Sequence, residues 1–413
     1  MRAISKKRCS IIESLEKKVA DFAGTQHAVI CNSGRAAIFY SLLALGIKHS
    51  DEVIIPDYSS QILPITVFCT GATPKFCDIE RKTLALSPRH LLKVLNPNTK
   101  AIIFVPPYGM PIDPSPILEI IKGKKIAFIT DAAQALAAKL GGRMVASFGD
   151  VGILSFNKFL DVPLGAAAVT DRQEIADKMK LIRENYEKRS VFAAINYRLL
   201  ELIGLRSKKA IVKTFWRDNY FYGKKTRTEK KYYQIVNGWV NGSSELNELR
   251  RSGALPPSII FQLWGAYGKR YYYRRRIERL ELLNLDSEFE HLQKYLNARK
   301  INAQIYEKGL KKDFSKFVIP AKSEASYLRY PILLSDKEQC FICIKKLLNE
   351  GFKMYYYYEP LHTSPCFRLE NSDQKFPESI YVADHLLLLP VDSNLSNIEI
   401  QRLLSIVNSS TCS

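Results

Sequence analysis

Two stretches of the chain decide its fold: IAFITDAAQ at residues 126–134 and VGILSFNK at residues 151–158. Each stretch begins with a run of apolar residues that is typical of a buried β-strand. Each then ends on polar side chains, among them Asp131 in the first and Ser155 and Lys158 in the second. Sheets of α/β proteins place ligand-binding groups at the ends of their strands. The two stretches therefore predict an acid and a lysine in one site.

The residues around these stretches alternate between strand and helix patterns up to about residue 185. We expect a helix and then a strand within residues 1–30, a helix from about residue 34 to 45, and strands at 51–56 and 101–105. Such alternation predicts a mostly parallel sheet with helices on both faces. The fold class is therefore α/β, and residues 1–185 form its large domain.

The rest of the chain follows a different pattern, and the predicted organisation has three parts. Residues 186–290 form a basic, aromatic-rich connecting region or insertion, and residues 291–413 form a small α+β domain. The expected elements toward the C-terminus are a long helix at 288–310, a strand at 327–333, a helix at 337–349 and a strand at 353–358. A length of 413 residues is consistent with two or three domains.

Composition indicates a soluble globular protein of a reducing cytoplasm. The chain is 46% hydrophobic and 25% charged, and it has no apolar run of the roughly 18 residues that a membrane-spanning helix needs. Its basic N-terminus leads into an amphipathic pattern and not into a signal peptide. Eight cysteines without regular spacing predict free thiols. Cys340 and Cys343 form a lone CxxC within a helical pattern, so we expect packing there and no metal site.

Positive charge is concentrated in one part of the chain. The net charge is +20, and residues 206–279 carry 18 Lys and Arg against 5 Asp and Glu, together with all three tryptophans. One hypothesis is that this segment docks on an anionic membrane surface or an acidic partner. The alternative is a solvated basic face over packed aromatic side chains. No nucleic-acid-binding motif accompanies the charge, which disfavours nucleic acid as a partner.

A third motif, Ser33-Gly34-Arg35-Ala36-Ala37, lies between a predicted strand and a predicted helix. The N–H groups and the dipole at a helix N-terminus suit a phosphate, and Ser33 and Arg35 can add a hydroxyl and a charge. The simpler interpretation is an ordinary helix cap. Asp131 can likewise cap a short helix, Gln134 can complete a capping box, and Lys158 can be a surface lysine.

The three motifs together are more specific than any one of them. A phosphate cup, then an acid, then a lysine is the order that pyridoxal phosphate (PLP) enzymes require. In PLP chemistry the lysine binds the cofactor covalently, and the acid keeps the pyridine nitrogen protonated so that the ring accepts electrons.

With these motifs the chain resembles the DegT/DnrJ/StrS family of PLP-dependent sugar aminotransferases. The resemblance covers most of residues 12–185, fades through 186–290 and returns toward the C-terminus. The shared motifs are GTQHAV at 24–29, the SGRAA cup at 33–37, DEVIIP at 51–56, GATP at 71–74, YG at 108–109, DAAQ at 131–134, SFGD at 147–150, EPLH at 359–362 and LLPV at 388–391.

The resemblance implies a fold, a reaction and a set of site residues. The fold would be the aspartate-aminotransferase-like fold, fold type I of PLP-dependent transferases. The reaction would move an amino group from an amino acid, with glutamate expected as the donor, to a keto-sugar expected to be nucleotide-linked, within a homodimer. The implied roles are the covalent lysine and proton shuttle for Lys158, the pyridine-nitrogen partner for Asp131, a contact with the ring hydroxyl for Gln134, and the phosphate site for Ser33, Gly34, Arg35 and Ser155.

Several positions depart from the family pattern. One residue, Asn157, separates Phe156 from Lys158 where most members have three. The usual second glycine is Ala166, Ser60 replaces a ring that stacks on the cofactor, and Pro106 replaces a histidine. Asn196 is a candidate for the asparagine that members lend to the neighbouring subunit.

These departures leave two alternatives to the aminotransferase. One is a non-catalytic family member that acts as a regulatory or scaffold protein. The other is a PLP-dependent sugar dehydratase, which Lys158 disfavours because such members generally carry histidine at that position.

Overall fold

The computed structural model describes residues 2–186, 276–311, 314–352, 354, 358–363, 367 and 375–410. Asn196 and most of the basic segment, residues 206–275, lie outside the described residues. No helix within these described ranges combines the length and the apolar character needed to cross a membrane.

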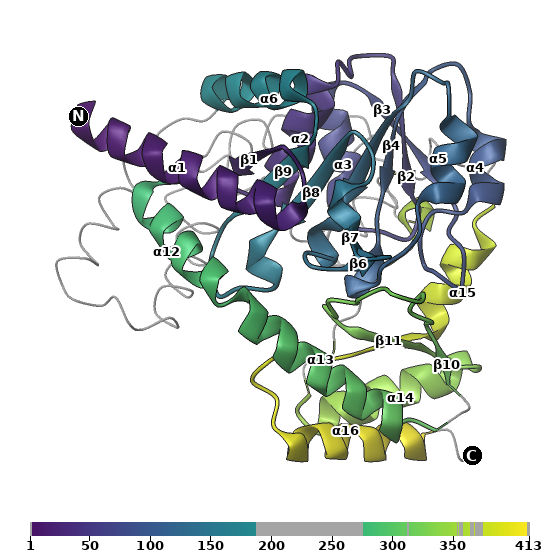
Figure 1. Cartoon of the computed structure of the whole chain (residues 1–413). Coiled ribbons are helices and arrows are strands. Elements are labelled where there is room, and N and C mark those ends of the chain that lie inside the picture. Colours follow the sequence, from purple (N-terminus) through teal and green to yellow (C-terminus); the bar gives the residue numbers. More distant parts are fainter. Residues whose placement is uncertain are drawn as a thin grey trace, which may run out of the picture.

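A seven-stranded sheet forms the centre of the N-terminal part (Figure 1). Its strands in spatial order are β1 (His27–Cys31), β9 (Ala166–Thr170), β8 (Val151–Ser155), β5 (Ala127–Asp131), β4 (Thr99–Phe104), β2 (Glu52–Pro56) and β3 (Thr73–Cys77). The five strands from β8 to β3 are parallel, whereas β9 runs antiparallel to both of its neighbours. The predicted mostly parallel sheet is therefore present.

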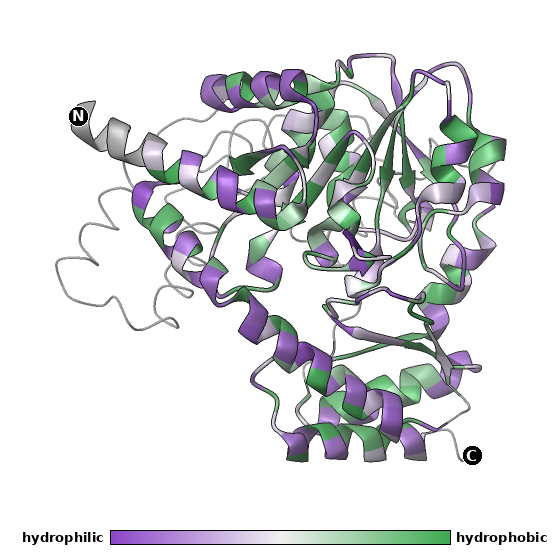
Figure 2. Ribbon diagram, in the orientation of Figure 1, coloured by the Kyte–Doolittle hydropathy of each residue, from purple (hydrophilic) through white to green (hydrophobic). Residues whose placement is uncertain are grey.

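Helices cover both faces of this sheet because alternate strand residues point to opposite cores. In β2, Val53 and Ile55 belong to one core and Ile54 to another. The first face packs against α2 (Gly34–Ala44), α3 (Ile62–Thr70) and α6 (Gln173–Tyr186). The second packs against α1 (Arg2–Ala23) and α12 (Arg279–Glu290) at one end and against α4 (Pro88–Val94) and α5 (Ser115–Ile121) at the other. Figure 2 shows the apolar strands between these amphipathic helices.

Short elements follow several of the strands. They are the 3₁₀ turns η1 (Pro107–Gly109), η2 (Ala132–Gln134), η3 (Val145–Ser147) and η4 (Phe156–Lys158), and the two-stranded hairpin of β6 (Lys139–Leu140) and β7 (Arg143–Met144). Among them, η1, η2 and η4 contribute to the site described below.

The C-terminal residues build a separate core around a three-stranded antiparallel sheet. Its strands are β10 (Ser315–Lys316), β11 (Tyr330–Leu333) and β12 (Leu386–Leu389), and its helices are α13 (Leu292–Gly309), α14 (Lys337–Asn349) and α16 (Asn397–Ser409). The helix α15 (Pro377–His385) precedes β12 and packs in another cluster, with Tyr58 and Tyr108. Cys340 and Cys343 are both buried in this core, which confirms their predicted packing role. Burial raises the pKa of the Cys340 thiol to about 12.

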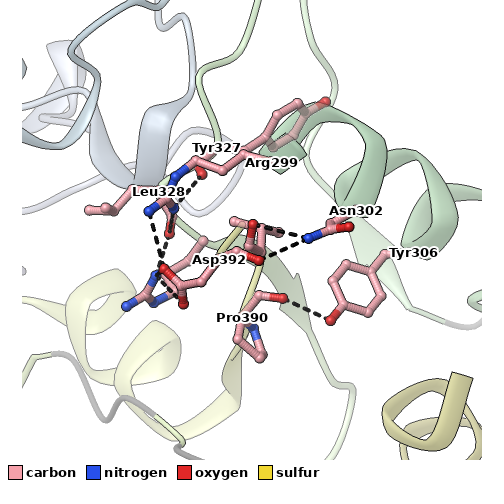
Figure 3. Close-up of polar contacts among 9 residues, drawn as sticks. Arg299, Asn302, Tyr306, Tyr327, Leu328, Pro390 and Asp392 are labelled. Atoms are coloured by element: carbon pink, nitrogen blue, oxygen red, sulfur yellow. Dashed lines mark hydrogen bonds and ion pairs between the residues drawn. The ribbon is translucent and has the colours of Figure 1, made fainter. Parts of the chain in front are cut away.

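Side chains of α13 tie this core to the segment that follows β12 (Figure 3). Arg299 donates to the Asp392 carboxylate at 3.1 Å, Asn302 donates to the Asp392 carbonyl at 3.0 Å, and Tyr306 donates to the Pro390 carbonyl at 2.8 Å. The three residues lie on one side of the helix because their spacing of three and four matches the helical repeat.

Two predicted elements differ from the structure. The helix expected at 288–310 is two helices, because α12 ends at Glu290 and α13 begins at Leu292, with His291 at the junction. The strand expected at 327–333 is shorter, β11, since Tyr327 has a positive φ of 48° that interrupts extended structure. Of the strand expected at 353–358, residues 353 and 355–357 lie outside the described residues.

Candidate active site

The predicted acid and lysine lie at the ends of neighbouring strands. Asp131 is the last residue of β5, Ser155 is the last residue of β8, and the two strands are paired in parallel. Lys158 ends the short turn η4 that directly follows β8. Because parallel strands end at the same edge of a sheet, both side chains come from one edge, as the sequence predicted.

The N-terminus of α2 meets this same edge. A Cβ built on Gly34 would lie 3.8 Å from Ser155 Oγ and 4.0 Å from the Ala133 Cβ. Ser33 is the N-cap: its Oγ accepts the Ala36 N–H at 3.4 Å and donates to Asn32 Oδ1 at 2.7 Å. The structure thus brings together Ser33, Gly34 and Ser155, and the helix-cap interpretation of Ser33 also holds.

Gly165 fixes the spacing between the α2 loop and the lysine turn. Its N–H donates to the Asn32 carbonyl at 3.0 Å, and its carbonyl accepts the Phe156 N–H at 3.0 Å. Its φ of +131° favours glycine, and an added Cβ would lie 3.1 Å from Leu285. The following Ala166, which replaces the usual second glycine, is fully buried in β9 without disturbing the strand pairing.

Asp131 is a buried carboxylate that accepts few hydrogen bonds from the described part of the protein. Its Oδ1 accepts the Ala133 N–H at 3.1 Å, and among the described residues no other hydrogen-bond donor reaches the carboxylate. Burial raises its pKa from the ordinary value, and the nearby charge of Lys158 and the Ala133 N–H oppose that rise. A cationic ligand group beside this oxygen pair would therefore be stabilised.

Lys158 has the opposite perturbation. The residue is exposed to solvent on one side, yet desolvation by the neighbouring protein lowers its pKa. The positive charge of Arg35 lowers the pKa further, whereas Asp131 raises it. A lowered pKa increases the neutral fraction of the amine, which is the form that reacts as a nucleophile.

Gln134 lies in η2 and has partners at both ends of its side-chain amide. Its Oε1 accepts the Tyr108 N–H at 3.1 Å, and its Nε2 donates to the Tyr358 hydroxyl at 2.8 Å. The sequence did not predict Tyr358 as a site residue, although it directly precedes the EPLH motif that supported the resemblance. Nothing in the sequence alone indicates a contact between residues 224 positions apart.

Two departures from the family pattern have simple local roles. Ser60 lies before α3, and its Oγ accepts the Ile62 N–H at 3.3 Å. Pro106 is extended and precedes the turn η1.

Among the described residues, a hollow of about 570 Å³ opens at the opposite end of the strands, beside Lys48, Asp51 and Arg172. It contains none of the predicted site residues. The candidate site is therefore located by the side chains at the strand ends and not by the size of a cavity.

Comparisons with known proteins identify related sequences. The sequence profile of the DegT/DnrJ/EryC1/StrS aminotransferase family matches residues 7–205 and 266–408. The chain is 37% identical over 174 residues to a GDP-perosamine synthase of Caulobacter vibrioides, a match that covers 42% of the chain and 47% of the relative. It is also 37% identical over 177 residues to the UDP-N-acetyl-3-dehydro-alpha-D-glucosamine 3-aminotransferase of Acidithiobacillus ferrooxidans, with 42% and 47% covered.

The chain thus spans about half the length of these curated relatives. A longer match, 25% identical over 391 residues, joins it to a pleiotropic regulatory protein of Geobacillus stearothermophilus and covers 92% of the chain and 84% of the relative.

Solved structures share the fold. The DesV protein of S. venezuelae superimposes with a TM-score of 0.70 at 21% identity, covering 98% of this chain and 90% of that one. The Helicobacter pylori aminotransferase PseC gives a TM-score of 0.70 at 18% identity, with 97% and 91% covered. The predicted fold class, that of PLP-dependent aminotransferases, is confirmed.

Proposed function

We propose that this chain, which belongs to the DegT/DnrJ/EryC1/StrS aminotransferase family, is a PLP-dependent aminotransferase that moves an amino group from an amino acid to a keto-sugar. The predicted family is thereby confirmed. The observation that carries the proposal is the placement of Asp131 and Lys158 at neighbouring strand ends, beside the N-terminus of α2.

The substrate class follows from the relatives. One of them is named for a GDP-linked sugar, GDP-perosamine, and another for the amination of a UDP-linked dehydro-sugar. We therefore take the acceptor to be a nucleotide-linked keto-sugar, and glutamate to be the donor, in a pathway that feeds polysaccharide synthesis.

The residues present fit PLP. The phosphate would be held by Ser33, Gly34 and Ser155, where a helix N-terminus offers backbone N–H groups and two hydroxyls, with Arg35 adding charge. Asp131, a buried carboxylate with an oxygen that no described donor reaches, suits the protonated nitrogen of a pyridine ring. When bound, PLP supplies the electron sink that stabilises negative charge on the carbon atom of the bound substrate.

The protein supplies the proton movements and the orientation. Lys158, with its lowered pKa, can take a proton at Nζ and return it at a neighbouring position, as a general base and then a general acid. The Asp131 carboxylate would hold a proton at the ring nitrogen by charge pairing. Gln134, whose Nε2 donates to the Tyr358 hydroxyl, would donate its other N–H to the ring hydroxyl.

Assembly is part of the proposal. We take the enzyme to be a homodimer in which the neighbouring subunit completes the site, with Asn196 as the candidate for the lent residue. Docking of the 206–279 segment on an anionic membrane or acidic partner also stays a prediction, and co-sedimentation with neutral and anionic vesicles at low and high salt tests it.

A second candidate is a non-catalytic regulatory member. A relative whose match covers 92% of the chain is named a pleiotropic regulatory protein, which favours this alternative. Retention of both Lys158 and Asp131 at one strand edge favours the enzyme, because a scaffold has no use for a buried carboxylate beside a lysine of lowered pKa.

A visible absorption spectrum of the purified chain with PLP separates the two. We expect a band of protein-bound PLP that bleaches when glutamate is added. A chain that binds PLP but does not respond to any amino acid would support the regulatory alternative, and a chain that gives no band would refute the cofactor assignment.

A further inference from the structure

The amide of Gln134 has only one orientation that satisfies its contacts. Its oxygen accepts the Tyr108 N–H at 3.1 Å, so its nitrogen must face the other way, toward the Tyr358 hydroxyl at 2.8 Å. Reversing the amide would set a donor against a donor at Tyr108. The side chain is buried, which makes such a mismatch costly.

The Tyr108 N–H is itself held in place. Tyr108 has a left-handed backbone, with φ 53° and ψ 18°, and is fully buried. Its carbonyl accepts the Leu328 N–H at 2.9 Å, and the carbonyl of Gly109 accepts the Ser326 N–H at 2.8 Å. A residue in this conformation persists only where its surroundings fix it, so the donor for Gln134 is part of a rigid turn.

Tyr358 is also fixed, but by residues that follow β2. Its N–H donates to the Tyr58 hydroxyl at 3.3 Å, and the two rings meet edge to face at 5.8 Å. Four residues later, His362 donates its N–H to Asp57 Oδ1 at 2.9 Å and its Nδ1 lies 2.7 Å from Asp57 Oδ2. Residues 57 and 58 therefore hold in place the C-terminal segment that contains Tyr358.

We propose that Tyr358 is a positioning residue that holds the Gln134 amide so that its second N–H is presented to the phenolic oxygen of PLP. The inference rests on the proposed function. An amide nitrogen carries two N–H groups, and the Tyr358 hydroxyl accepts one of them. The C-terminal part of the chain thus controls how strongly Gln134 donates to the cofactor.

This contact has a measurable consequence. A hydrogen bond to the phenolic oxygen stabilises negative charge there and weakens the hold on the proton shared with the Lys158 nitrogen. It therefore lowers the pKa of the Lys158–PLP linkage. The charged groups that act on Lys158, namely Asp131 and Arg35, are the same in every variant below.

The test titrates the visible band of the PLP-loaded full chain against pH. Tyr358→Phe keeps the ring and removes the hydroxyl, and Gln134→Ala removes the donor. Tyr306→Phe is the matched control, since it also removes one tyrosine hydroxyl with a 2.8 Å hydrogen bond but has no contact with Gln134. We expect the linkage pKa to rise in Gln134→Ala, to rise by part of that amount in Tyr358→Phe, and to stay at the parent value in Tyr306→Phe.

The possible outcomes distinguish a failure of the Tyr358 role from a failure of the proposed function. If no variant and no parent shows a PLP band, the proposed function falls, and this inference with it. If Gln134→Ala shifts the pKa and Tyr358→Phe does not, only the inference is overturned. The double variant should behave as Gln134→Ala alone, because Tyr358 acts through Gln134; additive shifts would contradict the inference. If Tyr358→Phe does not fold, His362→Gln, which loosens the same segment, should give a smaller rise of the same sign.

Discussion

His362 and Asp57 form a buried pair that joins the C-terminal segment to the end of β2. His362 Nδ1 lies 2.7 Å from Asp57 Oδ2, and the His362 N–H donates to Asp57 Oδ1 at 2.9 Å. The Asp57 carbonyl also accepts the Leu361 N–H at 2.9 Å. Asp57 is fully buried, so its carboxylate depends on these contacts in place of water.

Removing the histidine should destabilise the protein strongly. His362→Ala removes the imidazole partner of the buried Asp57 carboxylate and also the stacking of His362 on Phe376 at 4.6 Å. We expect the free energy of unfolding to fall by about 3 kcal/mol, the size typical of a broken buried pair. Urea unfolding measures it, and His291→Ala, which removes an exposed histidine, should cost under about 1 kcal/mol. Equal losses would mean that the pair does not anchor the segment.

The Asp57 carboxylate should also make the free energy of unfolding depend on pH in the parent but not in Asp57→Asn. Burial raises the pKa of Asp57 above the ordinary value of 3.8, and the His362 contacts oppose this. An acid with a raised folded pKa contributes stability below its unfolded pKa that is lost as the pH rises through the folded pKa. The stability of the parent relative to Asp57→Asn should therefore decrease as the pH rises from about 4. A constant difference across that window, measured by urea unfolding, would contradict the raised pKa.

Gly109 should tolerate no side chain. A Cβ there would lie 2.4 Å from the Tyr327 nitrogen and 2.7 Å from the Leu328 nitrogen, and these are backbone atoms that cannot move aside. Gly123→Ala is the matched control, because its φ of +74° is also positive but nothing lies within 4 Å. We expect Gly123→Ala to cost about 1 kcal/mol from backbone strain and Gly109→Ala to cost several times that. Thermal unfolding of both variants compares them, and similar melting temperatures would exclude the clash.

Much of the site could be predicted because its residues follow strands that the sequence marks clearly. Asp131 and Lys158 each come after an uninterrupted apolar run, and their positions at one strand edge follow from parallel pairing. Ser33 and Gly34 begin a helix in the way that such residues usually do. The positions of these residues depend on neighbouring residues in the sequence, so spacing and residue type were sufficient to predict them.

The rest depends on contacts between distant parts of the chain. Tyr358 reaches Gln134 across 224 positions, and His362 reaches Asp57 across 305. A lone tyrosine or histidine gives no sign of its partner. The junction at His291 was missed for a related reason, since the apolar pattern continues through it while the packing of α12 on α1 and of α13 on the C-terminal core divides the helix.

Lys158 should be the lysine that binds PLP. Reduction of the loaded protein with borohydride, followed by peptide mapping, should place the pyridoxyl group on the peptide that contains Lys158. Its lowered pKa and its position after β8 are the reasons. Lys158→Ala should lose the label and the amino-transfer activity. Lys122→Ala, which removes an exposed lysine paired with Glu119, should lose neither, and label on the Lys122 peptide would refute the assignment.

Asp131→Asn should separate cofactor binding from catalysis. Asparagine keeps the shape of the side chain and can still accept the Ala133 N–H, so the turn η2 should persist. It cannot hold a proton on the ring nitrogen by charge, and that charge matters most when negative charge develops on the substrate carbon. We expect PLP affinity near that of the parent and an amino-transfer rate lower by about 10²-fold or more. Asp113→Asn is the matched control, because the Asp113 carboxylate also accepts the N–H two residues on, from Ser115 at 2.9 Å, but lies at the surface. If Asp131→Asn binds PLP and turns over as fast as Asp113→Asn, then Asp131 is only the cap of a short turn, and the ring nitrogen must be sought elsewhere.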